Sequence, residues 1–198
     1  MINYSNGQNF KEKPGKSQKI SRKSISFSHG NRGMELEEDI NLSNEFYKDN
    51  EACLITKRPT PINVVKVDYT KGAVITNAYF EKQSTTDYNG VYKGRYIDFE
   101  AKSTLKLTSF PLANISKHQI EHLKNVLKHQ GIAFFIIEFA KINKVFLLDA
   151  SYVIDYYENG NRKSIPFNDI QKHGFEIKKG LAPRLNYLDI IDKIYVNS

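Results

Sequence analysis

The alternating side chains of residues 96–102 constrain the fold of this chain more than any other feature. A repeat of two residues is that of a β-strand, in which successive side chains point to opposite faces of the sheet. One face should therefore pack on a core, and the other should present a charged cluster. The apolar face carries Ile97, Phe99 and Ala101, and the charged face carries Asp98, Glu100 and Lys102.

A further carboxylate, Asp87, lies upstream of this strand, with the turn-forming residues Asn89, Gly90 and Gly94 in between. Because these residues tolerate a positive φ, we expect Asp87 to end a strand that folds back against the next one. Asp87 and Glu100 could then share one Mg²⁺, which prefers carboxylate and carbonyl oxygens. Such an ion polarises a phosphodiester and activates water. The alternative is that the charges form the solvated face of an ordinary strand.

Lys102 follows Glu100 on the same predicted face, where its charge could stabilise the transition state of phosphodiester cleavage. Asp98 shares this face and is a further catalytic candidate. Glu37 is another, because it borders the apolar side of a helix predicted over residues 33–50. Its alternative role is to complement the dipole of that helix near its N-terminus.

The net charge of +7 is concentrated near the N-terminus. Seven basic residues against Glu12 alone give residues 1–32 a net charge of +6, and the remainder of the chain carries +1. Few large apolar residues accompany these charges, so we expect a disordered basic arm over residues 1–30. Such an arm suits nucleic acid, although a simple solubility tail is the alternative.

The composition also argues against several classes of protein. The sequence has no apolar run of the roughly 18 to 20 residues that a membrane span needs, and residues 1–30 lack the apolar stretch of a signal peptide. The single cysteine, Cys53, excludes an intrachain disulfide and a cysteine zinc site. We therefore expect a cytoplasmic protein that is associated with the nucleoid and not with a membrane.

The remaining pattern predicts strands interspersed with helices, which favours an α/β architecture. Pro59 and Pro61 interrupt a strand at residues 52–56, so residues 58–72 should leave the sheet as a projecting element. Residues 73–80 resume a strand pattern. Further helices are expected over residues 116–130, 151–157 and 187–196, and buried strands over residues 132–140 and 145–148.

Two features of the helix at residues 116–130 have competing interpretations. Ser116 and Gln119 match a capping box, which would account for Gln119 by itself unless the helix begins beside the metal. His118 and His122 fit H-x-x-E-H, an inverted zinc-protease signature. We reject zinc hydrolysis because the helix is short, no clear third ligand follows, and a basic arm does not suit a protease.

Six segments together closely resemble the RecU family of Holliday junction resolvases. The resemblance runs from about residue 30 to residue 195, and the long central block is highly specific. The segments are GNRGMELEEDI (30–40), KRPTP (57–61), STTDYNGVYKGRYIDFEAK (84–102), TSFPL (108–112), HQIEH (118–122) and GLAPRLNY (180–187).

The resemblance implies a restriction-endonuclease-like core, a mixed central sheet flanked by helices, within a nuclease domain over residues 31–198. Residues 58–72 would form the family's projecting stalk. Carried over by motif, Lys102 would stabilise the transition state. Asp98 and Glu37 are further catalytic candidates that rest on their charge and position and not on the family motif. The implied Mg²⁺ ligands, for which Mn²⁺ is an expected substitute, are Thr85, Asp87, Glu100 and Gln119.

The function implied is the resolution of Holliday junctions by paired symmetric nicks during homologous recombination and DNA repair. A twofold homodimer would present two active sites to the symmetry-related strands of four-way junction DNA. Recombinase and branch-migration proteins are further expected partners. Two alternatives are a non-catalytic junction-binding protein that regulates recombination and a nuclease of the same fold acting on other DNA. The candidate DNA-binding residues are Arg32, Lys57, Arg58, Lys66, Lys71, Lys93 and Arg95.

Overall fold

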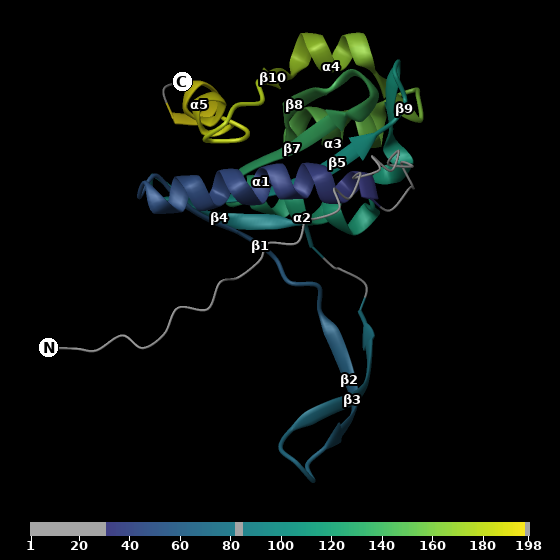
Figure 1. Cartoon of the computed structure of the whole chain (residues 1–198). Coiled ribbons are helices and arrows are strands. Elements are labelled where there is room, and N and C mark those ends of the chain that lie inside the picture. The colour runs from purple at the N-terminus through teal and green to yellow at the C-terminus, as the bar shows by residue number, and fades with distance from the viewer. Residues whose placement is uncertain (1–30, 82–84, 197–198) are drawn as a thin grey trace, which may run out of the picture.

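The computed structural model describes residues 31–81 and 85–196, so the predicted basic arm over residues 1–30 lies outside the described part. A six-stranded sheet in the order β1-β4-β5-β7-β8-β10 forms the centre of the molecule (Figure 1). Its strands are β1 (Leu54–Lys57), β4 (Tyr88–Tyr92), β5 (Arg95–Thr104), β7 (Ile132–Phe139), β8 (Lys144–Asp149) and β10 (Phe175–Ile177).

The sheet is mixed, because β5 and β7 are parallel while its other neighbouring strands are antiparallel. Two parallel strands need a crossover connection, and α2 provides it. All eight residues of β7 are buried, as a central strand covered on both faces requires. The α-helices are α1 (Asn31–Asp49), α2 (Lys117–Lys128), α3 (Ala150–Asn159), α4 (Phe167–His173) and α5 (Leu188–Ile191).

Two hydrophobic cores lie on the two faces of this sheet. The first packs α1 and α5 against residues such as Ile97 and Phe99 of β5. The second packs α2 and α3 against Phe135 and Ile137 of β7. The predicted mixed sheet flanked by helices is therefore confirmed, as are the predicted helices at α1, α2 and α3 and the buried strands at β7 and β8.

The apolar face of β5 contributes to an aromatic stack that crosses three neighbouring strands. Tyr88 of β4 stacks on Phe99 of β5 with ring centroids 4.8 Å apart, and Phe99 stacks on Phe134 of β7 at 4.6 Å. Tyr88 and Phe99 are also direct partners in the antiparallel ladder. Because a slip of one residue would reverse the faces of a strand, this buried stack fixes the register in which Asp87 approaches Glu100.

The β4–β5 hairpin corrects one prediction. Asp87 comes just before β4 instead of ending a strand, and Asn89 and Gly90 lie within β4 instead of forming the turn. A Cβ on Gly90 would approach the backbone of β1 to 2.0 Å, so glycine here allows close strand pairing. The turn is at Lys93 and Gly94, which have φ values of 47° and 75°.

A two-stranded ribbon, β2 (Ile62–Asp68) paired with β3 (Val74–Phe80), extends away from the sheet (Figure 1). Every residue of β3 is exposed, and β2 is exposed or half-buried throughout. The pattern over residues 73–80 predicted a strand, but that strand pairs with β2 and belongs to the projecting element. The projection therefore extends beyond residues 58–72.

Several short elements had no signal in the sequence pattern. Segments of three residues are too short for a period of two to be recognised, and α4 has only seven residues. No helix in the described ranges is both long and apolar enough to cross a bilayer. The short elements are β6 (Ser109–Pro111), β9 (Ser164–Pro166) and the 3-10 turns Leu112–Asn114 and Ala140–Ile142. The helix predicted over residues 187–196 is confirmed as α5 followed by a π-helical turn at Asp192–Val196.

Candidate active site

The charged face of β5 is turned toward α2 and is buried. The side chains of Asp98 and Glu100 are both 0% exposed, and that of Lys102 is 22% exposed. Burying an ionisable side chain is costly unless it is paired or hydrogen-bonded. The alternative that these charges merely solvate an ordinary strand is therefore wrong.

Glu100 is the centre of the first cluster. Its Oε2 accepts a hydrogen bond from the backbone N–H of Asp87 at 3.1 Å. Its Oε1 lies 2.6 Å from Nζ of Lys102. The Asp87 carboxylate in turn accepts from the backbone N–H of Ala101 at 3.3 Å. The antiparallel pairing of β4 with β5 thus brings together the three residues Asp87, Glu100 and Lys102 that the sequence singled out.

The environment of Glu100 disfavours its charge. Burial raises its pKa from 4.5 to about 8, the positive charge of Lys102 opposes this rise, and the nearby Asp87 carboxylate adds to it. Two carboxylates held this close repel one another, and a cation between or beside them relieves the repulsion. The donor set therefore fits a divalent cation with oxygen ligands.

Gln119 joins this cluster through the start of α2. Its Oε1 accepts from the backbone N–H of Ser116 at 3.0 Å, which completes the predicted capping box. Its Nε2 donates to Oε1 of Glu100 at 2.5 Å. The helix start does lie beside the carboxylates, so Gln119 contacts Glu100 as well as serving as the cap partner. The cap orients the amide so that its nitrogen faces Glu100.

Thr85 is half-buried and lies two residues before Asp87. Within the described ranges its hydroxyl has no hydrogen-bond partner. No group of three or more His, Cys, Asp or Glu side chains among the described residues is arranged to hold a metal. A metal here would therefore need oxygen donors of other kinds beside Asp87 and Glu100.

Asp98 belongs to a second, separate cluster on the same face. Its carboxylate accepts from Nη2 of Arg58 at 2.6 Å and from the hydroxyl of Tyr96 at 2.8 Å, it lies 2.8 Å from Nε2 of His122, and it also accepts from the hydroxyl of Thr86. Burial opposes ionisation, but the contacts with His122, Thr86 and Tyr96 and the charge of Arg58 outweigh it and lower the pKa of Asp98. Nothing in the spacing of these residues signalled the cluster.

Glu37 is engaged elsewhere. Its carboxylate pairs with Nζ of Lys57, while its backbone carbonyl accepts from the hydroxyl of Tyr88 at 3.2 Å. The Glu37 and Lys57 side chains are 31% and 41% exposed. No described contact joins Glu37 to Asp87 or Glu100.

The candidate DNA-binding residues occupy different environments. Lys66 and Lys71 are on the projecting element, where Lys71 is exposed beyond the end of β2. Lys93 pairs with Asp192 at 2.7 Å, and Arg95 donates to the backbone carbonyl of Tyr195 at 2.6 Å. Arg58 points inward to Asp98, as described above. The side chain of Arg32 lies outside the described part of the structure.

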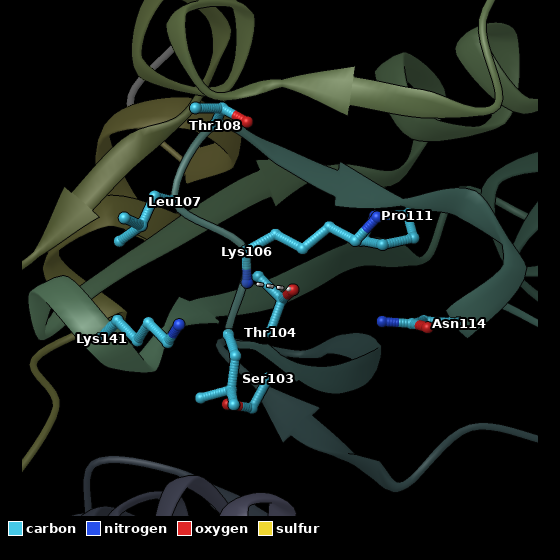
Figure 2. Close-up of a pocket in the computed structure, with 9 residues that line it drawn as sticks. Ser103, Thr104, Lys106, Leu107, Thr108, Pro111, Asn114 and Lys141 are labelled. Atoms are coloured by element: carbon cyan, nitrogen blue, oxygen red, sulfur yellow. Dashed lines mark hydrogen bonds between the residues drawn. The ribbon is translucent and has the colours of Figure 1, made fainter.

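A pocket of about 620 Å³ opens at the carboxyl end of β5, next to Lys102 in the chain (Figure 2). Lys141 and Asn114 reach toward it from opposite sides, and Lys106 extends along its wall (Figure 2). The residues that line it include two lysines and no carboxylate. The positive charge of these lysines suits an anion, but Glu100 and Asp87 do not line the pocket.

Comparison with known proteins gives consistent results. The family described as "RecU: Recombination protein U" matches residues 31–193. The protein "Holliday junction resolvase RecU" of Geobacillus sp. (strain WCH70) is 51% identical over 173 residues, which cover 85% of this chain and 86% of that protein. The protein of the same name from Bacillus cytotoxicus is 47% identical and is matched over 98% of both chains.

One solved structure is also similar in part. It is described as "1.6A resolution structure of Archaeoglobus fulgidus Hjc, a Holliday junction resolvase from an archaeal hyperthermophile". It covers 72% of this chain and 94% of its own, with a TM-score of 0.43 and 12% sequence identity.

Proposed function

This chain belongs to the RecU family, and from that membership we propose that it is a Holliday junction resolvase, an endonuclease that acts on four-way junction DNA in recombination and repair. The single observation that carries the catalytic part of the proposal is the buried group of Asp87, Glu100 and Lys102. Two adjacent carboxylates and a lysine are what metal-assisted phosphodiester cleavage requires.

The cofactor we propose is a divalent cation, specifically Mg²⁺, with Mn²⁺ as a substitute. Asp87 and Glu100 would hold it, because their mutual repulsion favours a shared cation. Thr85 and Gln119 are proposed as further oxygen donors; the carbonyl of Gln119 would have to serve the ion and the Ser116 cap together. When bound, such an ion supplies Lewis acidity and lowers the pKa of water.

The protein residues around this pair have distinct tasks. Gln119 donates to Oε1 of Glu100 and holds that carboxylate in one orientation. Lys102 neutralises the same oxygen at 2.6 Å, and its partly exposed ammonium group can turn toward a phosphate. There it would stabilise the negative charge that develops during cleavage. The β4–β5 register keeps Asp87 within reach of both.

Junction recognition is proposed to use the projecting ribbon and the basic residues near it. Lys66 and Lys71 would contact phosphates, and the positively charged N-terminal arm would add sequence-independent affinity. A homodimer would supply two active sites for the paired nicks on the two symmetry-related strands. Recombinase and branch-migration proteins are proposed partners on the same grounds of family membership.

The test is cleavage of a four-way junction and of a linear duplex by the purified protein, with and without Mg²⁺. Asp87→Ala should abolish cleavage while leaving junction binding in place, and Asp155→Ala, an exposed acid on α3, should retain full activity. Paired nicks in the junction alone are expected. Equal cutting of both substrates would contradict the assignment to junctions, and binding without cutting would favour a non-catalytic junction-binding protein.

A further inference from the structure

The projecting ribbon meets the body of the protein at two points, Arg58 before β2 and Thr86 after β3. The backbone N–H of Arg58 donates to the carbonyl of Asp87 at 2.7 Å, so the two points are adjacent. Beyond them β3 is exposed at every residue. We call Arg58 and Thr86 the two ends of the ribbon root. The direction of the ribbon must be set largely by the contacts of these residues.

Both ends of the root converge on one buried carboxylate, that of Asp98. Arg58 donates to it through Nη2, and Thr86 donates to it through its hydroxyl. Arg58 also donates to Thr86 through Nη1 at 3.0 Å, which ties the two ends to each other. His122 of α2 and Tyr96 of β5 complete the cluster, each 2.8 Å from Oδ2 of Asp98.

Asp98 differs from the carboxylates of the active site in the number of side chains that contact it. An ionised carboxylate offers about four acceptor sites, and four side chains already surround this one. The Asp98 side chain is completely buried, while that of Arg58 is only 18% exposed. Three of these partners contact Oδ2 and Thr86 contacts Oδ1, so Asp98 has little room for a metal, and Arg58 has little surface left for a phosphate.

The same cluster is directly connected to the active site. Thr86 is the neighbour of Asp87 in the chain, and Asp98 lies two residues from Glu100 on the same face of β5. A displacement of the ribbon root would thus move the segment that carries Asp87. A fixed root keeps Asp87 opposite Glu100.

We propose that Asp98 is a positioning residue: it locks the root of the ribbon to β5 and α2, and so holds the ribbon and the Asp87–Glu100 pair in a fixed relative orientation. Arg58 serves this positioning through its contacts with Asp98 and Thr86, and it does not contact DNA phosphate. The consequence for catalysis rests on the proposed function, because the ribbon must engage a junction for its orientation to matter.

Hydrogen–deuterium exchange of the DNA-free protein tests the lock directly. In Asp98→Asn, exchange in peptides covering residues 57–62 and 85–88 should accelerate on the order of tenfold or more, because the root opens locally. Exchange in β7 should stay unchanged. Thr86→Val, which keeps the volume and removes one donor, should give a smaller change in the same peptides if Asp98→Asn does not fold.

Glu138→Gln is the matched control. Like Asp98, Glu138 is a buried acid with a basic partner, which is Lys179. It should leave the exchange of the root unchanged. Unaltered root exchange in both Asp98→Asn and Thr86→Val would overturn the proposal. So would equal acceleration in β7, which would indicate only a general loss of stability.

Two further measurements separate positioning from catalysis and from DNA contact. Asp98→Asn should still bind Mn²⁺ in calorimetry, more weakly than the wild type because the segment carrying Asp87 is less firmly held, whereas a loss as large as that of Asp87→Ala would make Asp98 a ligand and overturn the proposal. Arg58→Ala should slow junction cleavage without changing the salt dependence of junction binding. A slope reduced by about one would identify Arg58 as a phosphate contact instead. Because exchange and Mn²⁺ binding involve no DNA, a wild-type protein that fails to cut junctions would refute the proposed function alone.

Discussion

Replacing Glu100 with glutamine should stabilise the metal-free protein at alkaline pH, although it should abolish cleavage. Burial raises the pKa of Glu100 to about 8 from an ordinary 4.5. A carboxyl group whose pKa is raised by folding favours the folded state fully below its unfolded pKa, and this stability is lost as the pH rises through the folded pKa. The metal-free wild type should therefore lose stability between about pH 4.5 and pH 8.

The size of the effect follows from the shift and from the hydrogen bonds. One pKa unit corresponds to about 1.4 kcal/mol, so ionised Glu100 costs on the order of 5 kcal/mol above pH 8 and about 2 kcal/mol at pH 6. Glutamine removes this cost, but its amide can accept at one oxygen only. Both oxygens of Glu100 accept hydrogen bonds, from Asp87 and from Gln119, and losing one costs about 1–3 kcal/mol.

Glu100→Gln should consequently be neutral or slightly destabilising near pH 5, and it should be more stable than the wild type by roughly 2–4 kcal/mol at pH 9. Urea unfolding in EDTA at several pH values measures this difference, with Asp155→Asn on the exposed surface as the control. Added Mg²⁺ should raise the stability of the wild type and not that of Glu100→Gln. A difference between the two proteins that stays constant within about 1 kcal/mol from pH 5 to pH 9 would refute this reasoning.

Three other perturbations test separate parts of the structure. Lys102→Ala should reduce junction cleavage by about 10²- to 10³-fold, and urea unfolding should show a change within about 1 kcal/mol, because the lysine is partly exposed and makes one ion pair. Gln119→Ala should lower the stability by about 1–2 kcal/mol in thermal unfolding, since Ser116 loses its reciprocal cap and Glu100 loses a donor. A stability equal to the wild type would show that neither contact matters. Removal of residues 1–29 should weaken junction binding and flatten its salt dependence in a titration at several salt concentrations, because fewer counterions are released. An unchanged slope would mean that the arm does not contact DNA.

Much of the fold was predictable because its signals are local. The alternation in β5, the apolar run of β7 and the capping box of α2 are each contained in a few consecutive residues, and each is confirmed. The position of the hairpin turn was left open because both Asn89-Gly90 and Gly94 permit a turn. Contact with β1 decides between them, since only glycine fits at position 90.

The candidate site likewise has residues that local sequence signals predict and residues that only contacts between distant segments bring in. Asp87, Glu100 and Lys102 could be selected from charge and spacing, and the structure places them together. The partners of Asp98 could not be selected, because Arg58 and His122 are far from it in the sequence. A hydrogen bond between distant residues leaves no period and no spacing in a single chain.

The sequence by itself determined which face of β5 carries the charged side chains, where the net charge is concentrated and which family the chain resembles. These properties depend on residue order alone, through the period of a strand and the identity of motif residues. Only the tertiary structure decided that Glu100 is buried with a raised pKa and that Asp98 contacts Arg58 and Thr86, at the two ends of the ribbon. Burial and hydrogen bonding arise when distant segments meet, and the packing of β4, β5 and α2 brings those segments together.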